Sequence, residues 1–209
     1  MNAQRHFLVV GYPRSRTAWL ANWLCHGGVH CGHELLARCV TPEEYLHERF
    51  VDSGRNCAFS GSAETAAALW MPQLAALLRG APIVLVSRPE AEVARSLERL
   101  GLDGDVRWAR EGLEYARRLP QTLEVRFADL DSEATARAIL AHVAPGEPLD
   151  WPRWRMLREF NVQITPRRME QLGRNAEQNA AALGESMAVY KGSHEDTKTR
   201  RGDGAGSNL

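Results

Sequence analysis

Short apolar runs alternate with longer amphipathic segments along this chain. The runs cover residues 7–10, 56–60, 82–87 and 123–127, and glycine, proline or polar residues flank them. Short runs with such flanks predict buried strands. Because strands that alternate with helices build parallel sheets, we expect an α/β fold, a three-layer sandwich with a central parallel sheet.

The amphipathic segments between these runs predict helices. They cover residues 17–25, 62–78, 89–100, 105–119 and 131–143. Ser62 is a residue type expected at a helix start, and Pro72 should kink or split the helix that follows. Asp131 or Ser132 should cap the last helix.

The pattern changes after residues 145–148, which read PGEP. Two further helices are predicted over residues 151–161 and 167–183, as a helical appendage spanning residues 151–191. Residues 192–209 are small and polar, and such a segment buries too little apolar surface to order itself. The sequence therefore predicts one domain over residues 1–191 and a disordered tail over residues 192–209.

Composition excludes several classes of protein. The chain has 209 residues, of which 44% are hydrophobic and 25% charged, which argues against a collagen, a coiled-coil rod or a wholly disordered chain. Lys+Arg 26 balances Asp+Glu 26, so no net charge attracts nucleic acid or a membrane surface, and we expect neither as a partner. No apolar run approaches the ~20 residues of a membrane span. The apolar run near the start, residues 7–10, is also too short for a signal-peptide core. Four Cys in a chain of this size do not suggest a disulfide scaffold. We expect a cytoplasmic protein with reduced thiols.

The segment after the first strand, GYPRSRTA at residues 11–18, connects a buried strand to a helix. Such a turn binds anions, because backbone N–H groups converge there and the helix start carries partial positive charge. The ATP-binding loop G-x-x-x-x-G-K-[ST] shares its first glycine with Gly11, but Arg16, Thr17 and Ala18 replace its last three residues. The pattern predicts a phosphate cradle without magnesium–ATP chemistry. A simple turn with solvated arginines is the alternative.

Residues 11–20, GYPRSRTAWL, resemble the 5′-phosphosulfate loop of sulfotransferases, G-x-P-[RK]-S-G-T-T-x-L. These enzymes use 3′-phosphoadenosine 5′-phosphosulfate (PAPS). Arg14, Ser15 and Thr17 fall on the family's positions, whereas Arg16 replaces its glycine and Ala18 its second threonine. The resemblance implies a P-loop NTPase-like fold of the sulfotransferase type. It also implies a cofactor site made by Gly11, Pro13, Arg14, Ser15, Arg16, Thr17, Ala18 and Trp19, with Trp19 stacking on adenine as in some members, or simply anchoring the first helix.

A second segment resembles the family's 3′-phosphate motif. Arg88 ends the strand over residues 82–87, and Ser96 follows eight positions later. Two helical turns span ~7.2 residues, so Ser96 shares a helix face with Pro89. The resemblance implies that Arg88 and Ser96 bind the 3′-phosphate; an ordinary arginine and a surface serine are the alternative. Residues 125–130, VRFADL, are similar to a structural strand and turn of the family, V-R-Y-E-D-L.

The resemblance also implies a general base. Some bacterial members place a glutamate soon after the first helix, where this chain has CGHEL at residues 31–35. Glu34 is the first candidate and His33 the second, although Glu34 could merely start a helix continuing to Arg38. Arg14 is the candidate for stabilising charge on the leaving oxygen. Because one phosphate leaves, arginine and backbone donors can replace a metal, and none is expected.

A zinc site is a further alternative in this part of the chain. Its potential ligands are Cys25, His26, His30, Cys31, His33 and Cys39. Their spacing fits no standard zinc pattern, so buried thiols are the favoured interpretation.

These features together predict a PAPS-dependent sulfotransferase. It would transfer a sulfuryl group to a hydroxyl or amine of a small-molecule or glycan acceptor by in-line displacement. The replacements Arg16 and Ala18 support one alternative, a catalytically silent nucleotide- or partner-binding module with the same fold. The sequence specifies neither the acceptor nor the oligomeric state.

Overall fold

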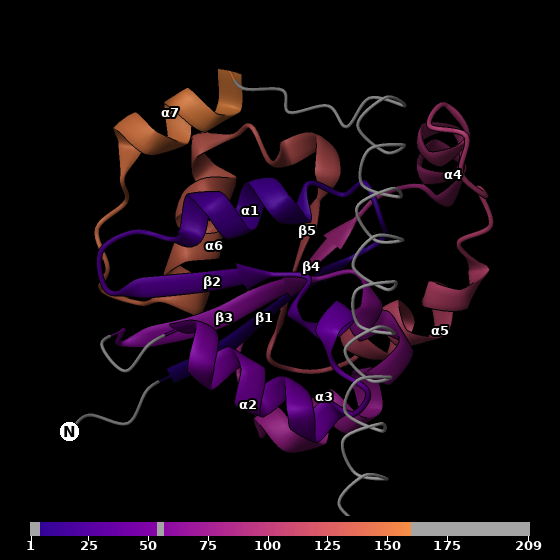
Figure 1. Cartoon of the computed structure of the whole chain (residues 1–209). Coiled ribbons are helices and arrows are strands. Elements are labelled where there is room, and N and C mark those ends of the chain that lie inside the picture. Colours follow the sequence, from indigo (N-terminus) through magenta and orange to yellow (C-terminus); the bar gives the residue numbers. More distant parts are fainter. Residues whose placement is uncertain (1–4, 54–56, 160–209) are drawn as a thin grey trace, which may run out of the picture. The chain divides into compact units, whose positions relative to one another are not determined.

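The computed structural model describes residues 5–53 and 57–159. A five-stranded sheet lies at its centre, and all of its strands run parallel in the order β2-β3-β1-β4-β5. The strands are β1 (Arg5–Gly11), β2 (Val29–His33), β3 (Phe59–Glu64), β4 (Ile83–Ser87) and β5 (Thr122–Arg126). Helices cover both faces of the sheet (Figure 1). The predicted α/β class with a central parallel sheet is confirmed.

The helices form the two outer layers. Over one face lie α1 (Thr17–Leu24), α6 (Glu133–Val143) and α7 (Trp151–Glu159) (Figure 1). Over the other lie α2 (Pro42–Ser53), α3 (Met71–Leu78) and α5 (Arg107–Arg117), while α4 (Glu90–Glu98) follows β4. Short 3₁₀ turns follow β2, β3 and β5, namely η1 (Leu35–Arg38), η2 (Ala66–Trp70) and η3 (Phe127–Asp129).

β1 is buried on both faces. Phe7 and Val9 pack into the core beneath α1, α6 and α7. Leu8 and Val10 pack into the core that α2, α3, α4 and α5 cover. A strand covered on both sides is apolar at every position, which is why residues 7–10 predict this strand so clearly.

The helix predicted over residues 62–78 is wrong in its first part. Ser62 does not start a helix; it is buried in β3, where its Oγ hydrogen-bonds the Tyr45 hydroxyl. The small residues of β3 fit beside large ones, since a Cβ added at Gly61 would lie 2.2 Å from the Phe7 ring. The predicted interruption at Pro72 is confirmed, because α3 begins at Met71 with this proline in its first turn.

β2 and α2 are missing from the sequence prediction. β2 reads VHCGH and is an edge strand, so it lacks the continuous apolar run of β1. The remaining predicted elements are present, with α7 matching the start of the helix predicted over residues 151–161. The helix predicted over residues 167–183 and the tail over residues 192–209 lie outside the described residues, and the predicted domain limits stay a prediction.

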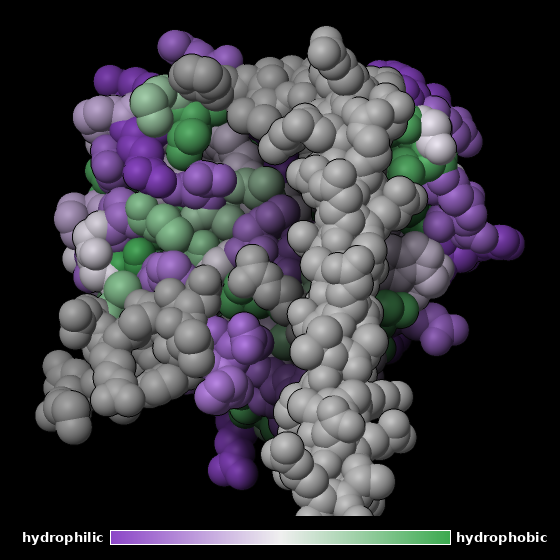
Figure 2. Space-filling view, viewed as in Figure 1, coloured by the Kyte–Doolittle hydropathy of each residue, from purple (hydrophilic) through white to green (hydrophobic). Residues whose placement is uncertain are grey.

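Where Figure 2 colours the surface, hydrophobic and hydrophilic residues both lie on it. Among the described residues, no helix combines the length and the apolar character needed to cross a membrane.

Candidate functional site

The loop between β1 and α1 turns tightly at residues with left-handed backbone. Arg14 has a φ of 65° and Arg16 a φ of 60°, and the Ser15 N–H donates to the Tyr12 carbonyl at 3.2 Å. Gly11 lets the loop approach β4, since a Cβ there would lie 3.1 Å from the Val86 carbonyl oxygen. Ser15 is wholly buried, and no described group hydrogen-bonds its Oγ. Burying a hydroxyl without a hydrogen-bond partner costs free energy. The loop is therefore suited to a ligand that accepts a hydrogen bond from Ser15.

Arg16 adopts a backbone conformation that glycine reaches without strain. Its φ of 60° and ψ of 27° lie in the left-handed region, which costs a residue with a Cβ about 1–2 kcal/mol. Its side chain turns away from the loop, where Nη1 lies 2.8 Å from a carboxylate oxygen of Asp131. Its guanidinium carbon also lies 4.9 Å from the centre of the Trp19 ring. The Arg16 side chain therefore lies over Trp19 and pairs with Asp131.

Trp19 belongs to the packing of the α1 layer. Its ring stacks on Trp23, with the ring centres 5.9 Å apart, and it lies against the core of that face. The structure thus agrees with its interpretation as an anchor for α1. Stacking on adenine stays a prediction, and it would require the Arg16 guanidinium to move. Ala18, the next residue in the predicted set, is exposed at the start of α1.

Two arginines lie close together here, Arg14 in the loop and Arg88 directly after β4. The Arg88 guanidinium, from the end of β4, donates to the Arg14 carbonyl oxygen. Arg14 Nε lies 3.4 Å from the Ser96 Oγ on α4. Burial, together with the neighbouring Arg88 charge, lowers the pKa of Arg14. Two cations held this close favour an anion between them.

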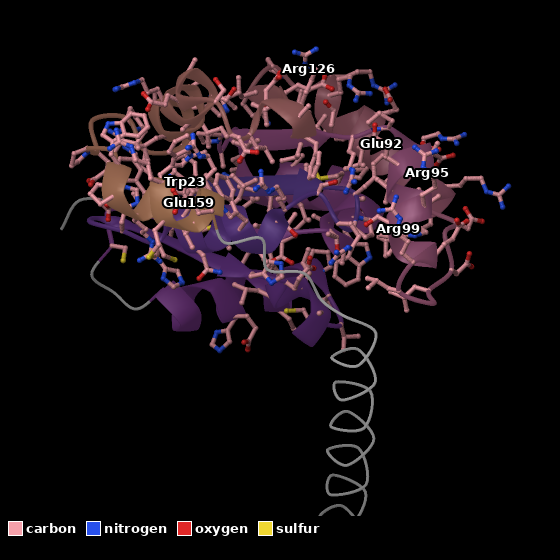
Figure 3. All side chains as sticks on the ribbon, turned by 90° about the horizontal axis from the view of Figure 1, so that it is seen from above. Trp23, Glu92, Arg95, Arg99, Arg126 and Glu159 are labelled. Atoms are coloured by element: carbon pink, nitrogen blue, oxygen red, sulfur yellow. The ribbon has the colours of Figure 1, made fainter. Side chains whose placement is uncertain are left out.

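Aromatic and acidic groups orient Arg88 within this cluster. Its guanidinium carbon lies 4.1 Å from the centre of the Phe127 ring, and Nε lies 3.5 Å from a Glu92 oxygen. Arg88, Glu92, Arg95, Ser96 and Arg99 line an open hollow of about 260 Å³. Figure 3 shows Glu92, Arg95 and Arg99 together on the side of the molecule away from Trp23. The hollow is therefore predominantly cationic.

A hydrogen-bonded triad of Tyr12, Glu90 and Arg110 holds the start of the loop. The Tyr12 hydroxyl donates to Glu90 at 2.5 Å, and Arg110 donates to the same carboxylate at 2.9 and 2.6 Å. Burial and the Glu90 carboxylate raise the pKa of Tyr12 to about 12. The bonds from Arg110 and Tyr12 lower the pKa of Glu90 to about 2. This triad ties the loop to α4 and α5, and the sequence pattern did not reveal it.

The predicted base candidates lie at the end of β2, next to the loop. His33 Nε2 lies 3.3 Å from the Thr17 Oγ1 and 3.7 Å from a Glu34 carboxylate oxygen. Burial lowers the pKa of His33, while the Glu34 charge acts in the opposite direction. Glu34 has a φ of 53°, and both of its carboxylate oxygens accept from the Thr65 N–H, at 3.2 and 3.3 Å.

Glu64, at the end of β3, is a buried carboxylate near the base candidates that the sequence prediction missed. Its side chain is wholly buried, and its carboxylate accepts from the N–H groups of Leu35 at 2.8 Å and Leu36 at 3.2 Å. Burial, and then the Glu34 charge, raise its pKa to about 7. A glutamate after a run of small residues is not recognisable from the sequence pattern. Its burial depends on the position of β3 between β2 and β1 in the sheet.

Comparison with known proteins finds matches among solved structures. No model of a known protein family matches the chain, and no curated protein sequence matches it. A sulfotransferase from Alicyclobacillus acidocaldarius matches with a TM-score of 0.51 at 14% identity, over 89% of this chain and 96% of that one. A sulfotransferase domain from the curacin biosynthetic pathway matches with a TM-score of 0.50 at 13% identity, over 79% and 80%. A mouse sulfotransferase complexed with PAP matches with a TM-score of 0.50 at 12% identity, over 74% of this chain and 63% of that one.

The chain has the sulfotransferase fold. Within this fold the site residues described above fall into two groups at the carboxyl ends of the strands, where open α/β sheets bind ligands. Arg14, Arg88 and Ser96 make up what we call the arginine edge. His33, Glu34 and Glu64 make up the acidic edge.

The zinc alternative finds no support in the described part of the sulfotransferase fold. No group of three or more histidine, cysteine, aspartate or glutamate side chains there could hold a metal ion. The Cys25 thiol instead exchanges hydrogen bonds with the backbone of Cys31, at 3.1 Å in each direction.

Proposed function

We propose that the chain is a PAPS-dependent sulfotransferase acting on a small-molecule or glycan acceptor. The observation that carries the proposal is the contact of Arg88 with the Arg14 carbonyl oxygen in the loop, together with that of Arg14 with Ser96 on α4. The two guanidinium groups come from elements 74 residues apart in the chain, so the fold, and not local sequence, assembles the cationic site. The sulfotransferase fold of three solved structures supports the same proposal.

The residues of the arginine edge fit a nucleotide that carries two separate phosphates. The buried Ser15 hydroxyl lacks a partner, and together with Thr17 and the loop N–H groups it would bind the 5′-phosphate. Arg88 and Ser96, on the hollow beside α4, would bind the 3′-phosphate. Trp19 would contact the adenine ring after the Arg16 side chain has moved.

PAPS supplies the sulfuryl group, whose bond to the 5′-phosphate breaks as the acceptor's oxygen or nitrogen bonds to sulfur. Arg14 neutralises the negative charge that grows on the departing phosphate oxygen. The loop holds this phosphate in line with the acceptor. A base at the acidic edge takes the proton of the acceptor.

His33 is the better placed of the two base candidates. Its Nε2 lies 3.3 Å from Thr17 of the loop, and its lowered pKa keeps the imidazole neutral and able to accept a proton at pH 7. Both oxygens of Glu34 accept from the Thr65 backbone. Glu34, 3.7 Å from the same Nε2, would stabilise the imidazolium that forms.

Two measurements on the intact chain test this function. Calorimetric titration with adenosine 3′,5′-bisphosphate, the desulfated product, should release heat with a stoichiometry of about one. Incubation with ³⁵S-labelled PAPS and a panel of phenols, alcohols, amines and glycans should label at least one acceptor. A folded protein that gives no heat at high concentration would contradict the proposal.

The two departures from the family's loop, Arg16 and Ala18, favour a second candidate function, a nucleotide-binding module without transfer activity. In that case the 3′,5′-bisphosphate would bind, but no acceptor in the panel would receive label. Detection of turnover above the rate without protein would eliminate this candidate.

A further inference from the structure

Two glutamates connect the ends of β2 and β3 in opposite directions. The Glu64 carboxylate, at the end of β3, accepts from the Leu35 and Leu36 N–H groups in the turn after β2. The Glu34 carboxylate, directly after β2, accepts from the Thr65 N–H in the turn after β3. The carboxylate at the end of each strand thus accepts hydrogen bonds from the backbone of the turn that follows the other strand.

We propose that Glu64 is a positioning residue, whose buried carboxylate holds the η1 turn and thereby fixes Glu34 and His33 beside the phosphate loop. The role of these two residues in transfer rests on the proposed function. The positioning itself rests only on the contacts just described.

The local backbone requires such support. β2 is the edge strand, so β3 is its neighbour in the sheet on one side only. Glu34 has a left-handed φ of 53°, which is unfavourable for a residue with a Cβ. The N–H groups of Leu35 and Leu36 begin the η1 turn, where no earlier turn supplies acceptors. Two bonds to one carboxylate supply what the turn lacks.

The groups around Glu64 connect it to the base candidates as well as to the η1 turn. An isolated carboxylate is costly to bury, and Glu64 is wholly buried. The groups that face it are Glu34, next to His33 on β2, and Ser62, which also bonds Tyr45 of α2. Glu64 therefore interacts with Glu34 through charge and is also hydrogen-bonded to the η1 turn.

Hydrogen exchange at single amides, measured by NMR on the full chain without nucleotide, tests the positioning. In Glu64→Ala the Leu35 and Leu36 amides should exchange at least ~10-fold faster, as expected for losing a bond to a charged acceptor. The pKa of His33 should rise toward its ordinary value of about 6.5, because a loosened turn lets water reach the imidazole. Ile139→Ala, a buried change in α6 on the other face of the sheet, serves as the control for general destabilisation.

A second variant keeps the test valid if Glu64→Ala does not fold. In Glu64→Gln one carboxylate oxygen becomes an NH₂ group that cannot accept, so one of the two amides should exchange faster and the other should stay protected. Amides that exchange no faster in the Glu64 variants than in Ile139→Ala, with an unchanged His33 pKa, would overturn the proposal.

The outcome is independent of the proposed function. The exchange rates and the His33 pKa need neither nucleotide nor turnover, so a chain that binds no 3′,5′-bisphosphate can still confirm the role of Glu64. If transfer activity is found, Glu64→Gln should shift the acidic limb of the kcat pH profile by the same amount as the His33 pKa, while adenosine 3′,5′-bisphosphate affinity stays within ~2-fold.

Discussion

The arginine edge and the acidic edge lie side by side on the same sheet but differ in how their charges are satisfied. At the arginine edge, Arg14 has Ser96 and the Arg88 charge as neighbours, and no carboxylate within the described residues pairs with it. At the acidic edge, Glu34 and Glu64 both accept from backbone N–H groups. Among the described residues Arg14 thus has no carboxylate partner, although Glu92 pairs with Arg88, whereas both carboxylates of the acidic edge are hydrogen-bonded.

This difference suits the two edges to two different tasks, phosphate binding and proton transfer. A site with unbalanced cations and a buried free hydroxyl gains most from an added anion, so the arginine edge suits nucleotide phosphates. A site with internally bonded carboxylates and an imidazole of lowered pKa suits proton transfer. The loop between β1 and α1 joins them, because Arg14 faces Ser96 while Thr17 faces His33.

The largest expected effect comes from removing the base. His33→Gln should lower kcat by about 10²- to 10⁴-fold, because the acceptor's proton then has no positioned base, with little change in bisphosphate affinity. Glu34→Gln should lower kcat less, since the imidazole remains. Both rates follow from labelled-sulfate assays at saturating PAPS. A larger loss in Glu34→Gln than in His33→Gln would reverse the assignment of the base.

Removing charge from the arginine edge comes next. Arg14→Gln should lower kcat by about 10²- to 10³-fold, a magnitude typical of losing one donor to a developing oxyanion. Arg126→Gln is the matched control, because Arg126, at the end of β5, is mostly exposed and pairs with Asp129 at 2.7 Å. Equal rates for the two variants would show that Arg14 does not act on the leaving phosphate.

The two edges were not equally predictable from the sequence. Two local motifs indicated the arginine edge, the loop at residues 11–20 and the spacing of Arg88 and Ser96, although only the fold brings the two segments together. The charge and hydrogen bonds of Glu64 depend on β3 being buried between β1 and β2, although its sequence FSGSAE contains mostly small residues.

Backbone conformation limits the prediction in the same way. Arg16 and Glu34 both adopt left-handed φ values, which non-glycine residues adopt rarely, so sequence reasoning left open whether Arg16 would change the loop. The strand β2 was missed because its edge position tolerates histidine and glycine. Tertiary contacts decided each of these points.

A smaller effect tests the buried carboxylate through pH. The pKa of Glu64 rises from 4.5 to about 7 on folding, so the folded chain binds this proton more tightly than the unfolded chain. The resulting stabilisation is full below pH 4.5 and is lost as the pH rises through about 7, by up to about 3 kcal/mol. Glu64→Gln lacks this ionisation, so denaturant titrations from pH 5 to 8 should show its free energy of unfolding falling less than that of the natural chain. Parallel curves would contradict the raised pKa.

The smallest effect concerns the residue that departs from the family's loop. Arg16→Gly removes a left-handed conformation that costs about 1–2 kcal/mol and an exposed ion pair with Asp131 worth at most about 1 kcal/mol. The unfolded chain also gains freedom with glycine, so the net change in unfolding free energy should stay within about 1 kcal/mol. Thermal unfolding measures it, and a loss of several kcal/mol would mean that Arg16 determines the loop's path.

The most direct test of the central claim compares two nucleotides on two proteins. Calorimetry with adenosine 3′,5′-bisphosphate and with adenosine 5′-phosphate isolates the contribution of the 3′-phosphate, in the natural chain and in Arg88→Ala. We expect the natural chain to prefer the bisphosphate by about 100-fold, as for a charge-assisted contact of about 3 kcal/mol, and Arg88→Ala to lose most of this preference, whereas Arg126→Ala keeps it. Equal affinities for the two nucleotides in the natural chain would contradict a 3′-phosphate site at Arg88 and Ser96.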